Sequence, residues 1–389
     1  MLLKVMMVPW VLAQQSPAPP PPASPPWLRD LAMHVDVYGR LDGHVAFSSD
    51  DVSVKNNSSR VGVMAEQTVL GDIKVLGQGE WKMNLGQGDT SYNVTENPDS
   101  GFGTFQSKTS QALTTRLGFI GLKLGRYGTL TLGKQWGVYY DVSGWTDLYI
   151  VFGTHGSSTF NAGTDGGQTG EGRANEALAY RVALGPLRLG IQAQFEGAKP
   201  GAVDTVSASA IYQLTKGLRA GVAYSHAFLN LGSTLVGYDG GDGQALTGGL
   251  VFDDAGWKFA LVDTWTHNHE AVSTASASVV YDTLGAELFA SRRFGELLML
   301  VAGFDYAIPR QLDARFVNPN YGTRDVLGSV RWLLDRKAAS FVYLEGRTGA
   351  TRDASGSRAE DVVMLGIRFN YSLRRGLGLD PIPEWRSNP

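Results

Sequence analysis

Few side chains in this sequence could do nucleophilic, acid–base or metal chemistry, and those few are scattered. Cysteine is absent, so a disulfide, a thiolate nucleophile and a cysteine-ligated zinc site are all excluded. An enzyme on this chain would need a Ser/His or Asp/His grouping, and no such motif stands out. The histidines have no recognisable companion motif at positions 34, 44, 155, 226, 267 and 269. We therefore predict no enzymatic activity, no catalytic residue, no metal site and no cofactor.

Three weaker ligand signals have simpler explanations. Residues 161–172 loosely resemble a calcium-binding loop, but Gly172 takes the place of the bidentate glutamate at position twelve. His267 and His269 could form an exposed metal clip, and His155 could titrate and gate. The aromatic residues between 136 and 152 could form a sugar track. Solvated loops and side-chain packing account for all of these features.

A regular pattern of charge is the more informative signal. In the first three predicted strands, Arg40, Arg60 and Glu80 share one row of alternating positions, and apolar residues such as Leu41 and Val63 occupy the other. Alternation with period two is typical of a strand that has one polar and one apolar face. One face would therefore meet water and the other an apolar environment.

Composition limits what that apolar environment can be. Hydrophobic residues make up 43% of the chain but charged residues only 18%, the net charge is -3, and there are 49 glycines. Without a basic block the chain lacks the electrostatic signature of nucleic-acid binding, so no nucleic-acid partner is expected. No run of 18 apolar residues occurs, which excludes a transmembrane helix. The apolar residues are instead spread over many short alternating segments.

We count sixteen such segments, and the connections between them alternate between short and long. Many strands of about ten residues with this arrangement are typical of an outer-membrane barrel. A secreted β-sandwich, which would bury the apolar row between two sheets, is the alternative. A weaker candidate at 274–281 is assigned to a loop. The predicted strands are 35–48, 58–69, 73–85, 113–124, 128–136, 173–183, 187–196, 203–213, 217–228, 244–253, 257–267, 283–293, 296–307, 323–334, 339–348 and 361–372.

The two ends of the chain lack this pattern. Residues 1–13 combine an early lysine, an apolar run and a small-residue cleavage pattern, which predicts a signal peptide. Residues 14–33 are proline-rich and predict an extended periplasmic segment. The barrel domain is then expected to span 34–373, followed by a C-terminal tail at 374–389.

Several short motifs in the first half of the chain resemble those of the Gram-negative general diffusion porins. They include Val35–Arg40, Gly77–Trp81, Thr115–Lys123, Gly133–Asp141 and Gly144–Asp147. The resemblance implies an all-β fold, a sixteen-stranded antiparallel transmembrane β-barrel with an inward-folded third loop at 137–172. It also implies a homotrimer among the lipids of the outer membrane, with passive diffusion of ions and small hydrophilic solutes as its function.

The same resemblance implies which residues line the narrowest part of the pore. Basic positions on the barrel wall match Arg40, Arg60, Arg116 and Arg173. Asp147 matches an acid on the loop, and Glu80 matches an acid on the wall. The second acidic loop position holds Val151, which leaves cations in excess and predicts a weak preference for anions.

Two residues concern assembly. Lys134 lies on the row of Leu130, Leu132 and Trp136, which should face outward. A lysine facing lipid costs about 2–4 kcal/mol at the bilayer midplane, so a subunit interface would relieve it. The resemblance places a latch at 85–111, where Asp89 could pair with a neighbour. A substrate-selective channel for anions or sugars, and a surface adhesin that transports nothing, remain as alternatives.

Overall fold

The computed structural model describes residues 34–49, 51–85, 89–91, 106–108, 112–153, 155–158, 172–195, 203–228, 235–274, 276–335 and 339–376. The predicted signal peptide and proline-rich segment lie outside the described residues, as does the tail from residue 377. The boundaries expected for these end segments therefore stay predictions.

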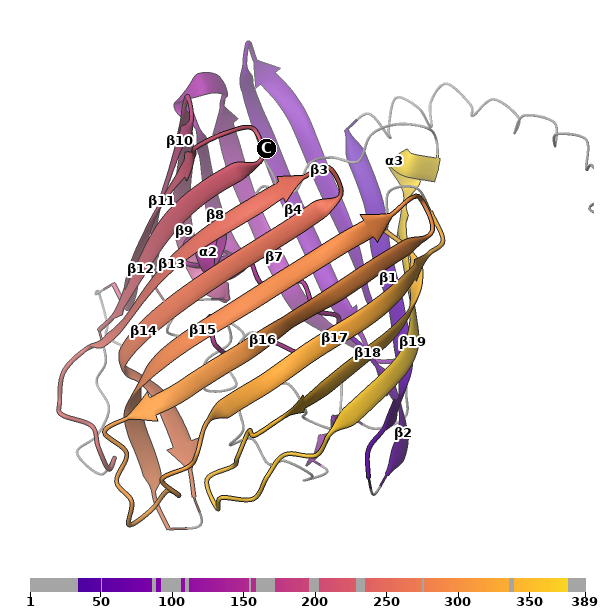
Figure 1. The fold of residues 1–389 in the computed structure, drawn as a ribbon. Helices are drawn as coiled ribbons and strands as arrows, with labels where there is room; N and C mark the ends of the chain where they lie inside the picture. The colour runs from indigo at the N-terminus through magenta and orange to yellow at the C-terminus, as the bar shows by residue number, and fades with distance from the viewer. Residues whose placement is uncertain are drawn as a thin grey trace, which may run out of the picture.

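The described strands form a closed antiparallel barrel of sixteen long strands (Figure 1), which confirms the predicted fold class. Each long strand pairs with its neighbours in chain order, and β1 pairs with β19 from Tyr38–Ser372 to Phe47–Val363 to close the ring. The short strand β2 pairs with the end of β1, and β5 and β6 form a separate two-stranded sheet. The strands are β1 Val35–Phe47, β2 Val52–Asn56, β3 Arg60–Leu70, β4 Ile73–Met83, β5 Asp89–Ser91, β6 Gln106–Lys108, β7 Leu113–Leu124, β8 Thr129–Trp136, β9 Arg173–Leu184, β10 Leu187–Gln194, β11 Thr205–Gln213, β12 Leu218–Ala227, β13 Gly243–Asp254, β14 Trp257–Ser273, β15 Ser278–Phe294, β16 Leu298–Arg310, β17 Thr323–Leu333, β18 Phe341–Gly349 and β19 Val362–Ser372.

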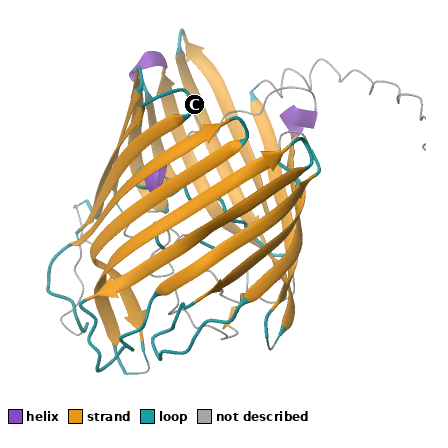
Figure 2. Ribbon diagram, in the orientation of Figure 1, coloured by secondary structure: helices purple, strands orange, loops and turns teal. Residues whose placement is uncertain are grey.

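Within the described residues, helical structure is short and scattered (Figure 2). It comprises η1 at Gly125–Tyr127, α2 at Tyr140–Ser143 and α3 at Leu373–Gly376. In the part of the chain that is described, no helix is long and apolar enough to cross a membrane. Short turns connect the strands at one end of the barrel. Gly71 and Gly185 in these turns have positive φ, where a residue with a Cβ would be strained.

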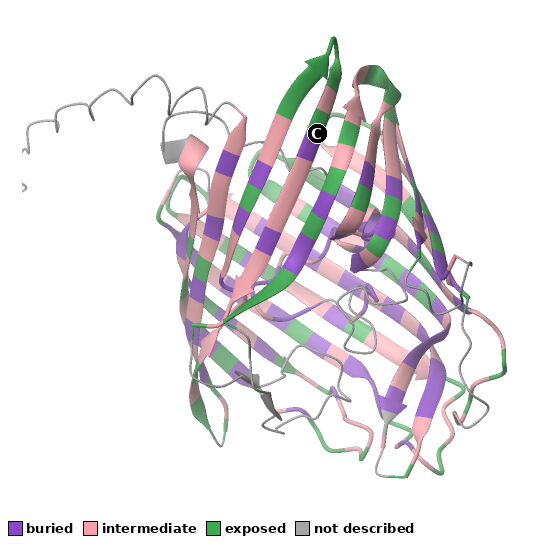
Figure 3. Cartoon of the chain, turned by 180° about the vertical axis from the view of Figure 1, so that it is seen from behind, coloured by how far each residue is buried: buried purple, intermediate pink, exposed green. Residues whose placement is uncertain are grey.

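Burial alternates along the strands as the sequence pattern predicts (Figure 3). On the outward row Ile120 is 65% exposed and Ile191 is 59% exposed, whereas on the inward row Glu287 and Glu345 are fully buried. Exposed aromatic residues gather at both ends of the outward face, for example Trp257 near the short turns. An apolar outer band with aromatic girdles is the surface that a bilayer requires.

One predicted loop is wrong. Residues 268–273 and 278–281 belong to strands, because β14 and β15 pair as far as Ser273–Ser278. The pairing shifts register between Thr266 and Glu270, which interrupts the alternation that would have identified the strand. Beyond this bulge the hairpin is held by a buried cluster that includes Val272, Val279 and Tyr281.

The outward face provides a direct test of the barrel's orientation to lipid. Val222 lies midway along β12 and is 47% exposed, so Val222→Lys should lower the free energy of unfolding by about 2–4 kcal/mol. Leu214, just past the end of β11, is 50% exposed, and Leu214→Lys near the rim should cost about 0–1 kcal/mol. Urea unfolding in lipid vesicles measures both. Equal costs would contradict a bilayer around the middle of the strands.

Candidate functional site

The structure brings the predicted pore arginines together on one wall of the barrel, with Arg40, Arg60 and Arg116 on β1, β3 and β7. Arg40 on β1 lies opposite Arg60 on β3. Arg60 Nε is 3.5 Å from Glu80 Oε2, and Arg116 Nε donates to Glu80 Oε1 at 2.8 Å. Tyr38 also donates to Glu80, at 3.1 Å. Glu80 on β4 therefore sits between two arginines on the same wall, rather than facing them across the lumen.

Arg173 and Asp147 are linked through two aromatic rings. The guanidinium of Arg173 lies 5.3 Å from the centroid of the Trp136 ring, and Trp136 stacks on Tyr140 with centroids 4.2 Å apart. The Tyr140 hydroxyl in turn donates to the Asp147 carboxylate. Asp147 thus lies near the arginine wall without an ion pair to it among the described contacts.

Trp136 does not follow the outward row on which the sequence placed it. The pairing of β8 with β9 shifts register between Gly133 and Gln135, so Trp136 lies opposite the buried Arg173. Lys134 remains on the outward side, because it pairs with Gly118 in the same row as the exposed Ile120. Its role at a subunit interface stays a prediction. Only the backbone of Asp89 is described, so its role is equally untested.

The chain after β8 is held against the far wall by a buried carboxylate. Glu345 on β18 is fully buried and accepts backbone N–H groups from Ile150 at 2.9 Å, Val151 at 2.8 Å and Phe152 at 3.5 Å. A carboxylate that accepts several N–H bonds replaces the water these groups would otherwise bind. Val151, the residue in place of an expected acid, is therefore positioned by its backbone.

Two more wall carboxylates hold the same segment. Glu287 on β15 accepts the Thr146 hydroxyl at 2.8 Å. Asp305 on β16 accepts the Gly156 N–H at 2.6 Å and contacts His155 Nδ1 at 2.9 Å. Burial, the largest influence, lowers the pKa of His155, but the hydrogen bond and charge of Asp305 outweigh it and raise that pKa above its ordinary value. His155 is thereby an anchor of the segment.

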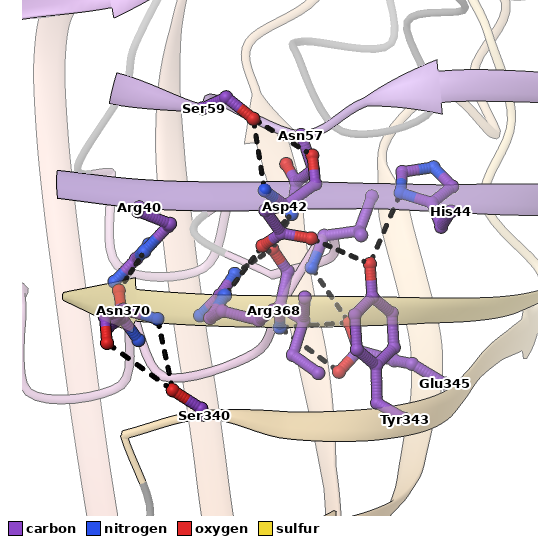
Figure 4. Close-up of polar contacts among 12 residues, drawn as sticks. Arg40, Asp42, His44, Asn57, Ser59, Ser340, Tyr343, Glu345, Arg368 and Asn370 are labelled. Carbon is purple, nitrogen blue, oxygen red and sulfur yellow. Dashed lines mark hydrogen bonds and ion pairs between the residues drawn. The ribbon is translucent and has the colours of Figure 1, made fainter. Parts of the chain in front are cut away.

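A fourth anchor lies where the barrel closes (Figure 4). Asp42 on β1 accepts from Arg368 Nε at 2.5 Å, from the Tyr343 hydroxyl at 3.0 Å and from Asn57 Nδ2 at 3.2 Å. Asn57 Nδ2 also donates to the Ile150 carbonyl at 2.8 Å. The closing strands and the segment after β8 therefore share one polar network.

Glycines on the inner wall leave room for the side chains of this segment. A Cβ at Gly221 would lie 2.7 Å from the Trp145 ring, and one at Gly249 would lie 2.8 Å from it. At Gly285 a Cβ would come within 2.2 Å of the Gly156 carbonyl oxygen. At contacts this short the neighbouring group would have to shift, so glycine at these positions lets the segment pack where it does.

The described residues of this segment, 137–153 and 155–158, thus contact much of the inner wall, through anchors that the sequence did not predict. Glu287, Asp305 and Glu345 fall on the polar rows of their strands, and that alternation was the only signal that could have found them. Among the described residues no group of three or more His, Asp or Glu could hold a metal ion. The calcium-like segment 161–172 lies outside the described residues, apart from Gly172.

The family model described as Gram-negative porin matches residues 11–303. Outer membrane porin N of Escherichia coli is 30% identical, over 87% of this chain and 92% of that protein. Outer membrane protein S2 of Salmonella typhi is 31% identical, also over 87% of this chain and 92% of that protein. Among solved structures, Salmonella typhi OmpF in complex with daunomycin has a TM-score of 0.69 at 19% identity, covering 87% of this chain and 97% of that one. An anion-selective porin from Comamonas acidovorans has a TM-score of 0.58 at 15% identity, covering 87% and 99%.

The anchoring of residues 137–158 predicts the effect of removing Glu345. In Glu345→Ala the N–H groups of Ile150 and Val151 lose their acceptor, at about 1–3 kcal/mol for each buried donor left unpaired. The segment should loosen, and liposome-swelling rates for a trisaccharide relative to a monosaccharide should rise.

A matched control is Glu66→Ala. Glu66 pairs with Lys74 at 2.6 Å near a short turn, away from this segment. The Glu66→Ala variant should leave the ratio of trisaccharide to monosaccharide swelling rates unchanged. An unchanged ratio in Glu345→Ala would show that Glu345 does not hold the segment in place.

Proposed function

The chain belongs to the Gram-negative porin family, and we propose that residues 137–158 narrow its channel opposite a wall of arginines. The protein is an outer-membrane porin of the general diffusion kind. It would pass ions and small hydrophilic solutes down their gradients. The arginines of the proposed constriction are Arg40, Arg60, Arg116 and Arg173, and its acids are Asp147 and Glu80.

The observation that carries the proposal is the hydrogen bonding of this segment to strands on the opposite side of the barrel. Glu345 and Glu287 lie on inward rows of β18 and β15 and bind Ile150 and Thr146. The segment leaves the wall after Trp136 on β8. A segment that leaves one wall and is bound to the opposite one occupies part of the cross-section, so it reduces the open channel.

The charges near the arginine wall support a preference for anions. Arg60 and Arg116 share the carboxylate of Glu80, and Arg40 donates to the neutral amide of Asn370 at 3.0 Å. Arginine keeps its charge when other cations crowd it. Fixed positive charge in a narrow lumen attracts anions and orients dipolar solutes.

The other acids on the inner wall contribute less to ion selectivity than their number suggests. Glu345 is fully buried beneath backbone N–H groups, Asp42 is paired with Arg368, and Asp325 is paired with Arg347 at 3.5 Å. These carboxylates are already neutralised by neighbouring donors. The segment itself presents Val151 where an acid was expected, so the positive wall would prevail.

Arg116 is the residue whose change tests the charge preference. Arg116→Gln removes one positive charge and leaves Glu80 with Arg60 alone. The ratio of chloride to potassium permeability, obtained from the reversal potential in a planar bilayer at low salt, should fall by roughly twofold, and screening should reduce the effect at high salt.

The control for this test is Arg126→Gln, because Arg126 lies in the exposed turn η1 beside Tyr127. It should leave the reversal potential unchanged. If the two variants behave alike, Arg116 does not lie at the constriction.

We further propose that the protein is a homotrimer with Lys134 in its interface, since the outward position of Lys134 would otherwise face lipid. Lys134→Glu should lower the fraction of trimer in unheated gel electrophoresis, whereas Lys216→Glu in the short turn after β11 should not. Full trimer formation by Lys134→Glu would place Lys134 away from the interface.

A further inference from the structure

A row of small residues crosses the outward face of the barrel. Ala290 on β15 lies opposite Ala302 on β16, Ala302 opposite Gly328 on β17, and Gly328 opposite Gly346 on β18. All four occupy the outward rows of their strands, between exposed neighbours such as Val326. Four in-register small residues make a trough between larger exposed side chains such as Leu300 and Leu344.

The trough is a groove with a volume of about 580 Å³. One side of the groove is formed by Leu300 and Leu344, which are 41% and 40% exposed. Each lies two residues before a member of the small row, Ala302 or Gly346. Val326 on β17 stands on the other side and is 60% exposed. The groove reaches Val363 on β19, so it crosses five neighbouring strands, a width of about 19 Å at the usual strand spacing.

The groove runs obliquely between the two ends of the barrel. At β15 it begins at Ala290, close to the turn after Phe294, and at β19 it reaches Val363, next to the first residue of that strand. Short turns of such barrels face the periplasm and long loops face outward. The groove therefore starts near the periplasmic rim and extends into the apolar band.

The positively charged side chain of Arg292 lies where the groove meets that rim. The guanidinium of Arg292 lies 4.8 Å from the Trp257 ring centroid and donates to the Ala255 carbonyl at 2.7 Å. Both Arg292 and Trp257 line the groove. Arginine has five N–H donors in a planar fork that suits phosphate, and tryptophan is typical of the headgroup level of a bilayer.

From these features we infer that the groove is a specific binding site for a phospholipid. One acyl chain lies along Ala302, Gly328 and Gly346, and the phosphate accepts hydrogen bonds from Arg292 at the periplasmic rim. A second copy of the chain fits less well, because an apolar barrel face laid on the groove would offer no acceptor to the Arg292 N–H groups that do not bind the Ala255 carbonyl. Burying the guanidinium charge with no opposite charge beside it would be unfavourable.

Two kinds of variant test this inference: one fills the groove with a larger side chain, and the other removes the positive charge of Arg292. A Cβ at Gly328 would lie 3.9 Å from the nearest heavy atom, the Val301 carbonyl oxygen, so Gly328→Leu fits the fold while its side chain occupies the groove. In native mass spectrometry of the trimer or monomer with added phosphatidylglycerol, Gly328→Leu should lose the tightest-bound lipid. Arg292→Gln should weaken its binding by roughly tenfold, as expected for the loss of a charge-assisted hydrogen bond.

Each variant has a matched control. Gly248→Leu also places a leucine on an outward row, at a position with nothing within 4 Å. Arg126→Gln removes an arginine that stacks on Tyr127, with 4.9 Å to the ring centroid, but that does not line the groove. Both should bind phosphatidylglycerol like the unmodified protein.

The inference is overturned if all four variants retain the lipid equally, or if Gly328→Leu changes the oligomeric state and not lipid binding, since the groove would then contact protein. Conductance should be the same in Gly328→Leu as in the unmodified protein. Loss of lipid binding with normal conductance separates this site from the channel proposed above.

Discussion

Inside a bilayer every backbone N–H and C=O group must find a partner within the protein, and the rest of this structure follows from that requirement. The pairing of β1 with β19 leaves the barrel without an open edge. The segment after β8 faces the same requirement, because it packs against the wall away from regular pairing. Several of its N–H groups donate to side-chain carboxylates, with Glu345 serving Ile150 and Val151, and Asp305 serving Gly156.

Space is the second constraint, and it gives the abundant glycines two opposite uses. On the inner wall, Gly221 and Gly249 admit the Trp145 ring, and Gly285 allows the backbone at Gly156 to approach. On the outer wall, Gly328 and Gly346 line a groove. The same residue type thus brings a chain segment close on one face and leaves room for a ligand on the other.

Much of the barrel could be predicted from the sequence, because alternation with period two identifies both a strand and its outward face. The same reasoning failed where a bulge breaks the period. At Gly133–Gln135 a shift in register turned Trp136 inward, and at Thr266–Glu270 another concealed the extension of β14. The partners of Glu345 could not be predicted, because they lie 195 residues away in the chain and depend on how the barrel closes.

The electrostatic character of the lumen follows from which charges are already neutralised. Acids on β1, β17 and β18 are paired or covered by donors, whereas Arg60 and Arg116 share Glu80. The zero-current potential of the unmodified protein, in a planar bilayer separating two concentrations of potassium chloride, tests this account most directly. Its sign should report a modest preference for chloride over potassium. A clear preference for potassium would contradict the account, because acids in the lumen would then outweigh the arginine wall.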